Sequence, residues 1–512
     1  MSWSRQFLDA LAQPPYSWAY VLRTIGVSDS PGTSYSAATL PNLGDPIIGS
    51  NVRIGGSTLT PGTWASTLGA FSVDLAGDLS RLKRAWTRGT FVELLIGRPE
   101  WPLSDYQRLA VGQVQQLAAR APNLATLTCR DLLSALRSRP TVQASLLALG
   151  YRISGVTTTV TVDYAPGAAT LTLASVTGFN VGTGGSAVLI TPTSGTAFYL
   201  TYTAVVGLTL TGVSSAGVHG TTAVGAAATS VIQPVVYCNG HPLEVLRRFL
   251  LSVQGAAIHG YDTLAAGDGL ALPYDFVDHM DTSSNYLLST PTMSFQVVAT
   301  EAQDNPLGWI TSWLAAGGFF VTIRQGLLTG RAAQPSILAT IRDAADITDD
   351  DIETIQWEAW DSDASSEAAN VTITSNNTST TSFGLENQAT LPAYYRQDYD
   401  VSQLLFADEA AGRQGIIDRV YESHVRIPER YTITCIGLRH AALAPGDFVR
   451  ITSRLSSTRH GVIYRYHNGD AYTVDAGLDN TRAIIVQVSA DYGRGRVSLV
   501  ARVYPVSSAQ FP

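Results

Sequence analysis

The sequence predicts a mainly β protein with some α structure, divided over several domains. At 512 residues it exceeds what one hydrophobic core usually serves. Charged residues make up only 14% of the chain, against about 25% in an average soluble domain. Short apolar or alternating runs, separated by Gly, Pro and Asp, are typical of antiparallel sheets. We expect barrel- or sandwich-like domains, a small α/β domain and an inserted all-β module.

Residues 1–154 are predicted to form an N-terminal β-rich domain. Leu79, Leu82 and Trp86 have the spacing of a short amphipathic helix. A Gly-Arg-Pro-Glu segment at 97–100 should end one strand, because proline cannot continue a central ladder. The expected strands are Trp18–Val27, Phe71–Asp78, Phe91–Gly97, Arg108–Leu117 and Leu124–Arg130.

Residues 155–233 are interpreted as an inserted small all-β accessory module. Thr, Val, Gly, Ala and Ser dominate this stretch, and Asp163 is its only acidic or basic residue besides His219. Small residues at turns and β-branched residues between them predict about four to six strands.

Residues 234–335 are predicted to hold a docking helix and a small α/β domain. The helix is expected within Tyr237–Ser252, with Pro242 in its first turn. A strand at Ser294–Thr300 precedes a second helix opening at Asn305-Pro306. A hairpin should then turn at Gln325-Gly326.

Residues 336–512 are predicted to form the C-terminal β-rich domain or domains. One helix is expected at about Ser402–Asp418, and tight turns at Pro445-Gly446-Asp447 and Gly493-Arg494-Gly495 are expected to join strands. The expected strands are Ile347–Trp360, Ala368–Ser375, Arg419–Arg426, Tyr431–Leu438, Asp447–Thr452, Ala483–Ser489 and Arg496–Tyr504.

Charge and cysteine content exclude several classes of protein. A net charge of −8 argues against a nucleic-acid grip, which needs a basic stripe to displace counterions. The three cysteines, Cys129, Cys238 and Cys435, match neither a disulfide framework nor a zinc site, and are expected to be small buried residues. No signal peptide and no membrane span are predicted, so we expect synthesis in the cytoplasm. The low charge suits large permanent interfaces, or alternatively a secreted β-rich protein with an uncharged coat.

No motif for catalysis is found: HExxH, a P-loop and GxSxG are all missing. The Gly-rich run at 182–186 has no helix after it and is expected to be a loop. Asp349, Asp350, Asp351 and Glu353 form the strongest acidic cluster, but they lack the turn-forming Gly of a Ca²⁺ loop. We expect a solvated helix or strand start there, and no metal.

Other titratable residues also favour structural roles. No Ser or Cys nucleophile accompanies the histidines in a recognisable motif, and loop composition explains the acidic stretch as well as a glycosidase-like carboxylate pair does. We therefore predict no catalytic, cofactor-binding or metal-binding residues, and no cofactor. The residues considered are His279, Asp281, His460, His467, Asp262, Asp268, Asp275 and Asp278.

Aromatic residues in the 155–233 module keep a glycan-binding alternative open. Aromatic faces stack on sugar rings, although core packing is their simpler use. The module has no Trp, and its aromatic residues are Tyr164, Phe179, Phe198, Tyr199 and Tyr202.

Three segments within about 240–455 resemble the hub proteins of long-tailed bacteriophages and of gene transfer agents. The first is Asn305–Val321 (NPLGWITSWLAAGGFFV) with Gly326–Arg331 (GLLTGR), a helix followed by a hairpin. The second is Ile347–Glu353 (ITDDDIE), leading into a strand. The third is an Ala-rich stretch at 407–418, then paired strands and Leu443–Thr452 (LAPGDFVRIT). The 155–233 module lies outside this pattern.

The resemblance implies a non-enzymatic virion protein of the baseplate, at the tail tip. It implies a homotrimer in which two related β-domains per chain alternate, as a pseudo-sixfold ring that continues the tail tube. Its expected partners are the distal tail protein, the tail tube or tape measure, and central fibre or spike proteins. Phage DNA would pass through the lumen during ejection, and an acidic wall would repel phosphates. The alternatives are a receptor protein that binds host surface glycans through 155–233 and, third, a cell-wall hydrolase.

Overall fold

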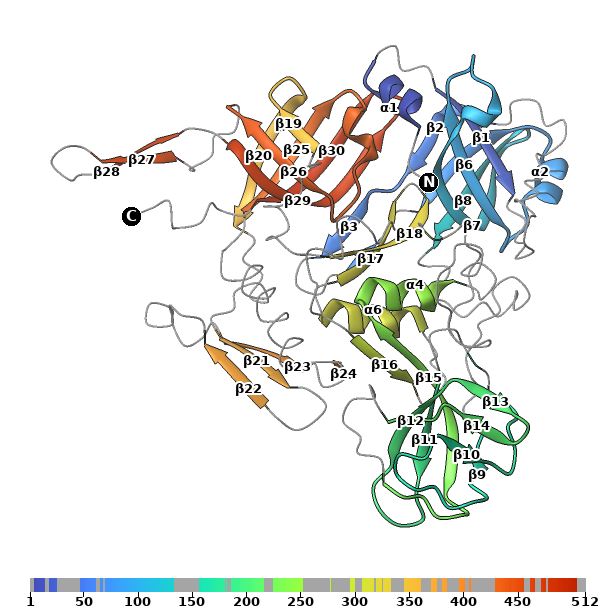
Figure 1. The fold of residues 1–512 in the computed structure, drawn as a ribbon. Helices are drawn as coiled ribbons and strands as arrows, with labels where there is room; N and C mark the ends of the chain where they lie inside the picture. The colour runs from blue at the N-terminus through green and yellow to red at the C-terminus, as the bar shows by residue number, and fades with distance from the viewer. Residues whose placement is uncertain are drawn as a thin grey trace.

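The computed structural model describes residues 4–13, 18–24, 47–60, 65–67, 70–132, 156–179, 181, 186–215, 224–251, 277, 295–299, 306–316, 319–324, 326–332, 345–360, 370–374, 380–384, 396–400, 405–406, 429–454, 461–465, 471–475 and 478–503. Strands dominate these residues, as the composition predicts. Two curled sheets lie side by side at one end of the molecule, and a smaller β-module lies at the other end (Figure 1). No helix among the described residues has the length and apolar character to cross a membrane.

The N-terminal β-unit is a six-stranded antiparallel sheet with the order β1-β6-β7-β8-β5-β2. The sheet curls until β1 and β2 contact each other. Helix α2 (Leu79–Ala85) lies between β5 and β6 in the chain, and it buries Leu82 and Trp86 in the core of the unit. The strands are β1 (Ala19–Thr24), β2 (Ile47–Ile54), β5 (Phe71–Ala76), β6 (Phe91–Gly97), β7 (Gln107–Ala121) and β8 (Leu124–Asp131).

The C-terminal β-unit has a six-stranded path with the order β19-β26-β29-β30-β25-β20. All its neighbouring strands are antiparallel except β19 and β26. The 3₁₀ helix η6 (Arg439–Ala442) lies between β25 and β26 in the chain. The strands are β19 (Ala345–Thr348), β20 (Ile352–Trp360), β25 (Glu429–Ile436), β26 (Phe448–Ser453), β29 (Leu478–Asp491) and β30 (Arg496–Val503).

The two β-units have the same strand order. If the six strands of each unit are lettered a to f along the chain, both sheets read a-d-e-f-c-b. Both units also place a short helix between strands c and d. The strand registers also show which core residues occupy equivalent positions in the two units. The equivalent residues are Phe71 and Tyr431, Val73 and Ile433, Leu75 and Cys435, Val114 and Ile485, and Leu127 and Leu499.

Local details of the two units agree as well, although strands a and d pair antiparallel in the N-terminal β-unit and parallel in the C-terminal β-unit. Gly89 (φ 91°) and Gly446 (φ 89°) both precede strand d in the left-handed region. The N–H of Gly89 donates to Val114 O (2.8 Å), as that of Gly446 donates to Ile485 O (2.7 Å). Both ladders between strands e and f then shift register, after Val114 in one unit and after Ile485 in the other. The sequences Gly-Thr-Phe-Val-Glu-Leu and Gly-Asp-Phe-Val-Arg-Ile start at these two glycines. The chain therefore contains an internal structural repeat.

The accessory module has its own hydrophobic core, built around Leu171, Ile190, Leu200 and Leu210. Among its described residues, Asp163 accepts a hydrogen bond from the N–H of Ala228 (2.7 Å) and so holds a turn. The module contains β9 (Thr158–Thr159), β10 (Thr170–Thr172), β11 (Ser186–Thr191), β12 (Phe198–Tyr202), β13 (Ala204–Val206) and β14 (Thr209–Thr211).

Strand β15 (Val231–Gly240) crosses the expected boundary at residue 233. Its first half pairs with β11 and its second half with β16 (Phe295–Ala299). The middle part of the chain adds helices α4 (Pro242–Leu250) and α6 (Pro306–Ala316) and the hairpin β17 (Phe319–Arg324) and β18 (Leu327–Ala332). The hairpin turns at Gly326 (φ 74°), as predicted.

The remaining described elements are smaller. Helix α1 (Arg5–Leu11) opens the described chain, and η1 (Leu103–Asp105) precedes β7. Strands β3 (Ser57–Thr60) and β4 (Ala65–Thr67) form a hairpin. A three-stranded sheet has the order β22-β21-β23, and β27 pairs with β28. These strands are β21 (Asn370–Thr374), β22 (Thr380–Gly384), β23 (Arg396–Asp400), β24 (Leu405–Phe406), β27 (Gly461–Arg465) and β28 (Ala471–Asp475).

Four expectations about single elements need correction. The expected strand Ile347–Trp360 is broken at 349–351, because β19 pairs with β26 whereas β20 pairs with β25. Residues 237–240 extend β15, and the helix begins only at Pro242. Leu405–Phe406, in the expected helix at 402–418, are a strand paired with β16, and the rest of that helix lies outside the described residues. The turn at 445–447 joins η6, and not a strand, to β26. The expected strand Arg419–Arg426 lies outside the described residues.

Candidate functional site

The most extensively built feature of the described structure is the junction between the two β-units. Helix α1 comes first in the described chain, yet its buried side chains Phe7 and Leu11 lie in the core of the C-terminal β-unit. Ile96, at the end of β6, reaches the same core. Ser4 caps α1 by accepting the N–H of Phe7 (3.2 Å). The core of one unit is thus completed by residues from the other end of the sequence.

Arg98 holds α1 against the N-terminal β-unit. It follows β6, and its Nη2 donates to the carbonyl oxygens of Ala10 and Gln13, both at 3.3 Å. The guanidinium also lies 5.9 Å from the ring centroid of Trp18, within cation–π range. The carbonyl oxygen of Ala10, which also accepts the N–H of Gln13, thus gains a second donor at the end of the helix. Helix α1 is therefore fixed to both units.

One strand joins the two sheets directly. After β2 ends in the N-terminal β-unit, the chain passes through Gly55-Gly56 and becomes β3, which pairs with β29 of the C-terminal β-unit. Thr58 lies opposite Gln487, and Ser57 opposite Val488. Because strands β2 and β3 are separated by only two residues, the two sheets have little freedom to move apart at this point.

The β17–β18 hairpin contacts both units from the side. Arg331 on β18 forms a buried ion pair with Asp447, which precedes β26. The ring of Phe320 on β17 packs on Gly446, leaving no room there for a side chain. At the turn, Gly326 lies against Arg108 and Val111 of β7, since an added Cβ would be 3.0 Å from Cδ of Arg108. The hairpin therefore braces the junction.

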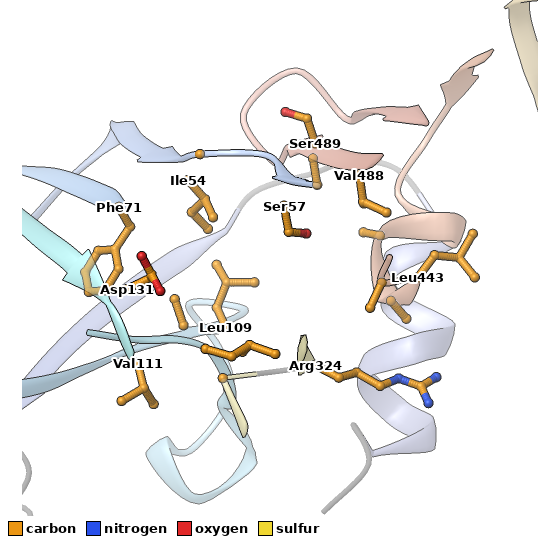
Figure 2. A pocket seen from close by; sticks show the side chains of 18 of the residues that line it. Ile54, Ser57, Phe71, Leu109, Val111, Asp131, Arg324, Leu443, Val488 and Ser489 are labelled. Carbon is orange, nitrogen blue, oxygen red and sulfur yellow. The ribbon is translucent and has the colours of Figure 1, made fainter. Parts of the chain in front are cut away.

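A pocket lies where the N-terminal β-unit, the hairpin and the C-terminal β-unit meet. Its walls are mostly apolar or backbone, with Leu109, Val111 and Val488 among the lining residues. Figure 2 shows Asp131 on one wall and Arg324 on the opposite side. These groups do not converge as a nucleophile, base and oxyanion site would. The pocket lies at the junction of the two β-units and the hairpin.

Asp351 and His440 form an ionisable pair whose pKa values are both shifted. The Nε2 of His440 lies 3.4 Å from Oδ2 of Asp351, and both side chains are buried. Burial alone would raise the pKa of Asp351, but the N–H of Thr348, His440 and Arg439 together hold it below its usual value. Burial lowers the pKa of His440, more than Asp351 raises it. The pair ties η6 to the turn between β19 and β20.

The acidic cluster is dispersed among separate partners. Asp349 accepts the hydroxyl of Ser453 (2.6 Å), and Glu353 pairs with Arg496 (2.6 Å). The expectation of a solvated strand start is wrong for Asp351, which is 7% exposed, because its carboxylate closes the turn onto Thr348. No group of His, Cys, Asp and Glu in the described part of the chain has the arrangement of a metal site.

Burial raises the pKa of several other groups. Burial raises the pKa of the Cys129 and Cys435 thiols to about 12, so both behave as small apolar residues. Tyr20 and Tyr492 meet at the junction, and burial raises the pKa of both hydroxyls. The side chain of Cys238 lies outside the described residues.

Other candidates from the sequence cannot be placed. His279, His460, His467, Asp262, Asp268, Asp275, Asp278 and Asp281 and most of the Gly-rich run at 182–186 lie outside the described residues. The sugar-binding candidates are placed, and most face inward. Tyr164, Phe179, Phe198 and Tyr202 belong to the module's core, and only Tyr199 is partly exposed. Four of the five rings therefore have no free face for a sugar.

Comparisons with known proteins give limited information. No known protein-family model matches the chain, and no curated protein matches it in sequence. Among solved structures, the chain is similar to one described as "Virion of native gene transfer agent (GTA) particle", with 15% identity and a TM-score of 0.26. The similar region covers 42% of this chain and 42% of that chain.

Proposed function

We propose that this chain is a structural subunit of a virion tail tip, a baseplate hub whose copies form a ring that continues the tail tube. The observation that carries the proposal is the internal repeat, two β-units of identical strand order in one chain. Three copies would supply six such units, which is the number that a ring needs to match a sixfold tube. Proteins with one unit per chain need six copies for the same ring.

The junction supports this proposal, because a ring needs a fixed angle between neighbouring units. Helix α1 and the β3–β29 pairing hold the two units of one chain together. The β17–β18 hairpin contacts both units, at Asp447 and at Arg108. A pair of domains joined only by a flexible linker would leave that angle undefined. The proposal assigns the chain no catalytic role.

Charge is consistent with DNA passage through such a ring. The net charge of −8 gives little attraction to phosphates. The distal tail protein, the tube or tape measure, and a fibre or spike are the proposed neighbours. The accessory module projects away from the two β-units (Figure 1), where it would remain accessible on the outside of a ring.

Two measurements test the proposal. The mass of the purified full chain in solution should correspond to three copies, and antibodies against the chain should label tail tips in electron micrographs. A protein that is monomeric under all conditions and missing from particles would contradict the proposed function. Labelling along the tail shaft would contradict its place at the tip.

A further inference from the structure

Strand e of the C-terminal β-unit has an edge that another segment covers. The first half of β29, up to Ile484, pairs with β26 on this edge. Ile485 then bonds the backbone of Asp447 and Gly446. Beyond it, β3 takes over the same edge at Gln487 and Val488. The second half of β29 is therefore flanked on both sides, by β30 and by β3.

Among the described residues, no strand covers the equivalent part of β7 in the N-terminal β-unit. The first half of β7, up to Gln113, pairs with β6, and Val114 bonds Gly89 and Thr90 as Ile485 bonds its partners. From Gln116 to Ala121, β7 pairs with β8 alone among the described strands. Gln116, Ala119 and Ala121 are exposed. An open edge of this kind is a template for a further strand.

Each β-unit has a hairpin at the same place in its chain order, between strands b and c. Hairpin β3–β4 lies between strands b and c of the N-terminal β-unit, and hairpin β21–β22 follows strand b of the C-terminal β-unit before strand c. Thr58-Leu-Thr in β3 matches Thr372-Ile-Thr in β21, and each Thr-apolar-Thr segment pairs with the second strand of its own hairpin. In Figure 1 the sheet of β21, β22 and β23 stands apart from both β-units. The β7 edge of the same copy lies on the other side of the molecule from this sheet (Figure 1).

We infer that β22 of one copy pairs with the open edge of β7, over Gln116–Ala121, in a second copy of this chain. Strand β21, the match of β3, is already paired on both sides, by β22 and β23. The outer strand β22 of the same hairpin would therefore cover β7 of a second copy, as β3 covers β29 within one copy. Of the two outer strands of its sheet, β22 (Thr380–Gly384) has no charged residue, whereas β23 contains Arg396 and two aspartates. Charged residues protect an edge against pairing. Such head-to-tail pairing of unlike surfaces closes into a ring when the rotation allows it.

The inference rests on the proposed function, because it names the contact that would join copies in the ring. Cross-linking tests it on the full chain with Gln116→Cys and Ser382→Cys, treated with a short bis-maleimide. We expect covalent dimers and trimers on a denaturing gel. The pair Ser80→Cys and Ser382→Cys is the matched control, since Ser80 is exposed on α2, and it should give none. Each single variant controls for native cysteines, and circular dichroism checks folding.

Assembly should also slow amide hydrogen exchange of the Gln116–Ala121 peptide at least tenfold, because paired edge amides are protected. If the chain forms trimers but neither cross-links nor protects this peptide, the edge pairing is wrong and the proposed function stands. If the cross-link forms within one chain, the partner is not a second copy. If the protein is monomeric and missing from particles, both proposals fail.

Discussion

Replacing Gly446 by alanine should destabilise the C-terminal β-unit through two separable effects. The residue has φ 89°, a region that costs an L-residue about 1–2 kcal/mol. An added Cβ would also collide with Cζ of Phe320 and lie 2.7 Å from its Cε2, so the ring would have to move away. Overpacking of this kind costs about 1–3 kcal/mol. We expect a total loss of about 2–5 kcal/mol.

A double-mutant cycle separates the two effects. In a Phe320→Ala background the clash disappears, so Gly446→Ala should cost only the backbone part, about 1–2 kcal/mol. Gly167→Ala is the matched control, because Gly167 has φ 85° and open space around its Cβ position. It should cost about the same backbone strain in the accessory module.

Amide hydrogen exchange measures these costs locally, on peptides from β26 and β29, without requiring the whole chain to unfold as one unit. The expected result is that Gly446→Ala speeds amide exchange strongly in the wild-type background. In the Phe320→Ala background the same substitution should speed exchange much less, relative to Phe320→Ala alone. Equal costs in the two backgrounds would refute the packing of Phe320 on Gly446 as the reason for glycine at this position.

Three further predictions concern the junction. Burial holds the pKa of His440 below its ordinary 6.5, so the unfolded chain binds a proton at this histidine before the folded chain does. The stability of the C-terminal β-unit should therefore fall as the pH drops below about 6.5. His440→Gln should reduce the pH dependence of the urea-melt midpoint between about pH 7 and pH 5. Removing one partner of a buried ion pair leaves the other uncompensated, so Arg331→Met should cost about 3–5 kcal/mol in the same melts, whereas adding Asp447→Asn should recover part of the loss. Phe7→Ala removes a fully buried ring at about 3–5 kcal/mol, and limited proteolysis should then release the N-terminal helix; resistance equal to wild type would show that α1 is not anchored by Phe7.

Elements with strong local chemistry could be predicted from the sequence. Leu79, Leu82 and Trp86 predicted α2, and Pro242 predicted the start of α4. Gly326 predicted the hairpin turn because only a residue tolerant of positive φ fits it. These elements depend on neighbours within a few residues. Their boundaries shifted where tertiary pairing decided, as at residues 237–240, which continue β15 because β16 pairs with them.

The junction could not be predicted, because its contacts join distant parts of the chain. Nothing local indicates that Ser57 pairs with Val488 or that Phe7 enters a core built by residues beyond 340. The burial of Asp351 depends on His440 and so was missed in the acidic cluster. One local pattern does indicate the internal repeat. The segments GTFVEL at 89–94 and GDFVRI at 446–451 match at glycine, phenylalanine and valine, and an internal comparison of the sequence would have exposed the repeat.

Strand β15 determines how mechanical load would travel through the molecule. One continuous backbone forms part of the accessory module and then part of the sheet with β16. A force that pulls on the module would therefore load the hydrogen-bonded ladders of β15 with β11 and β16, and would not simply extend a flexible linker. A pulling force on an object bound to the module would be transmitted, with its direction, to the part of the chain that contains α4.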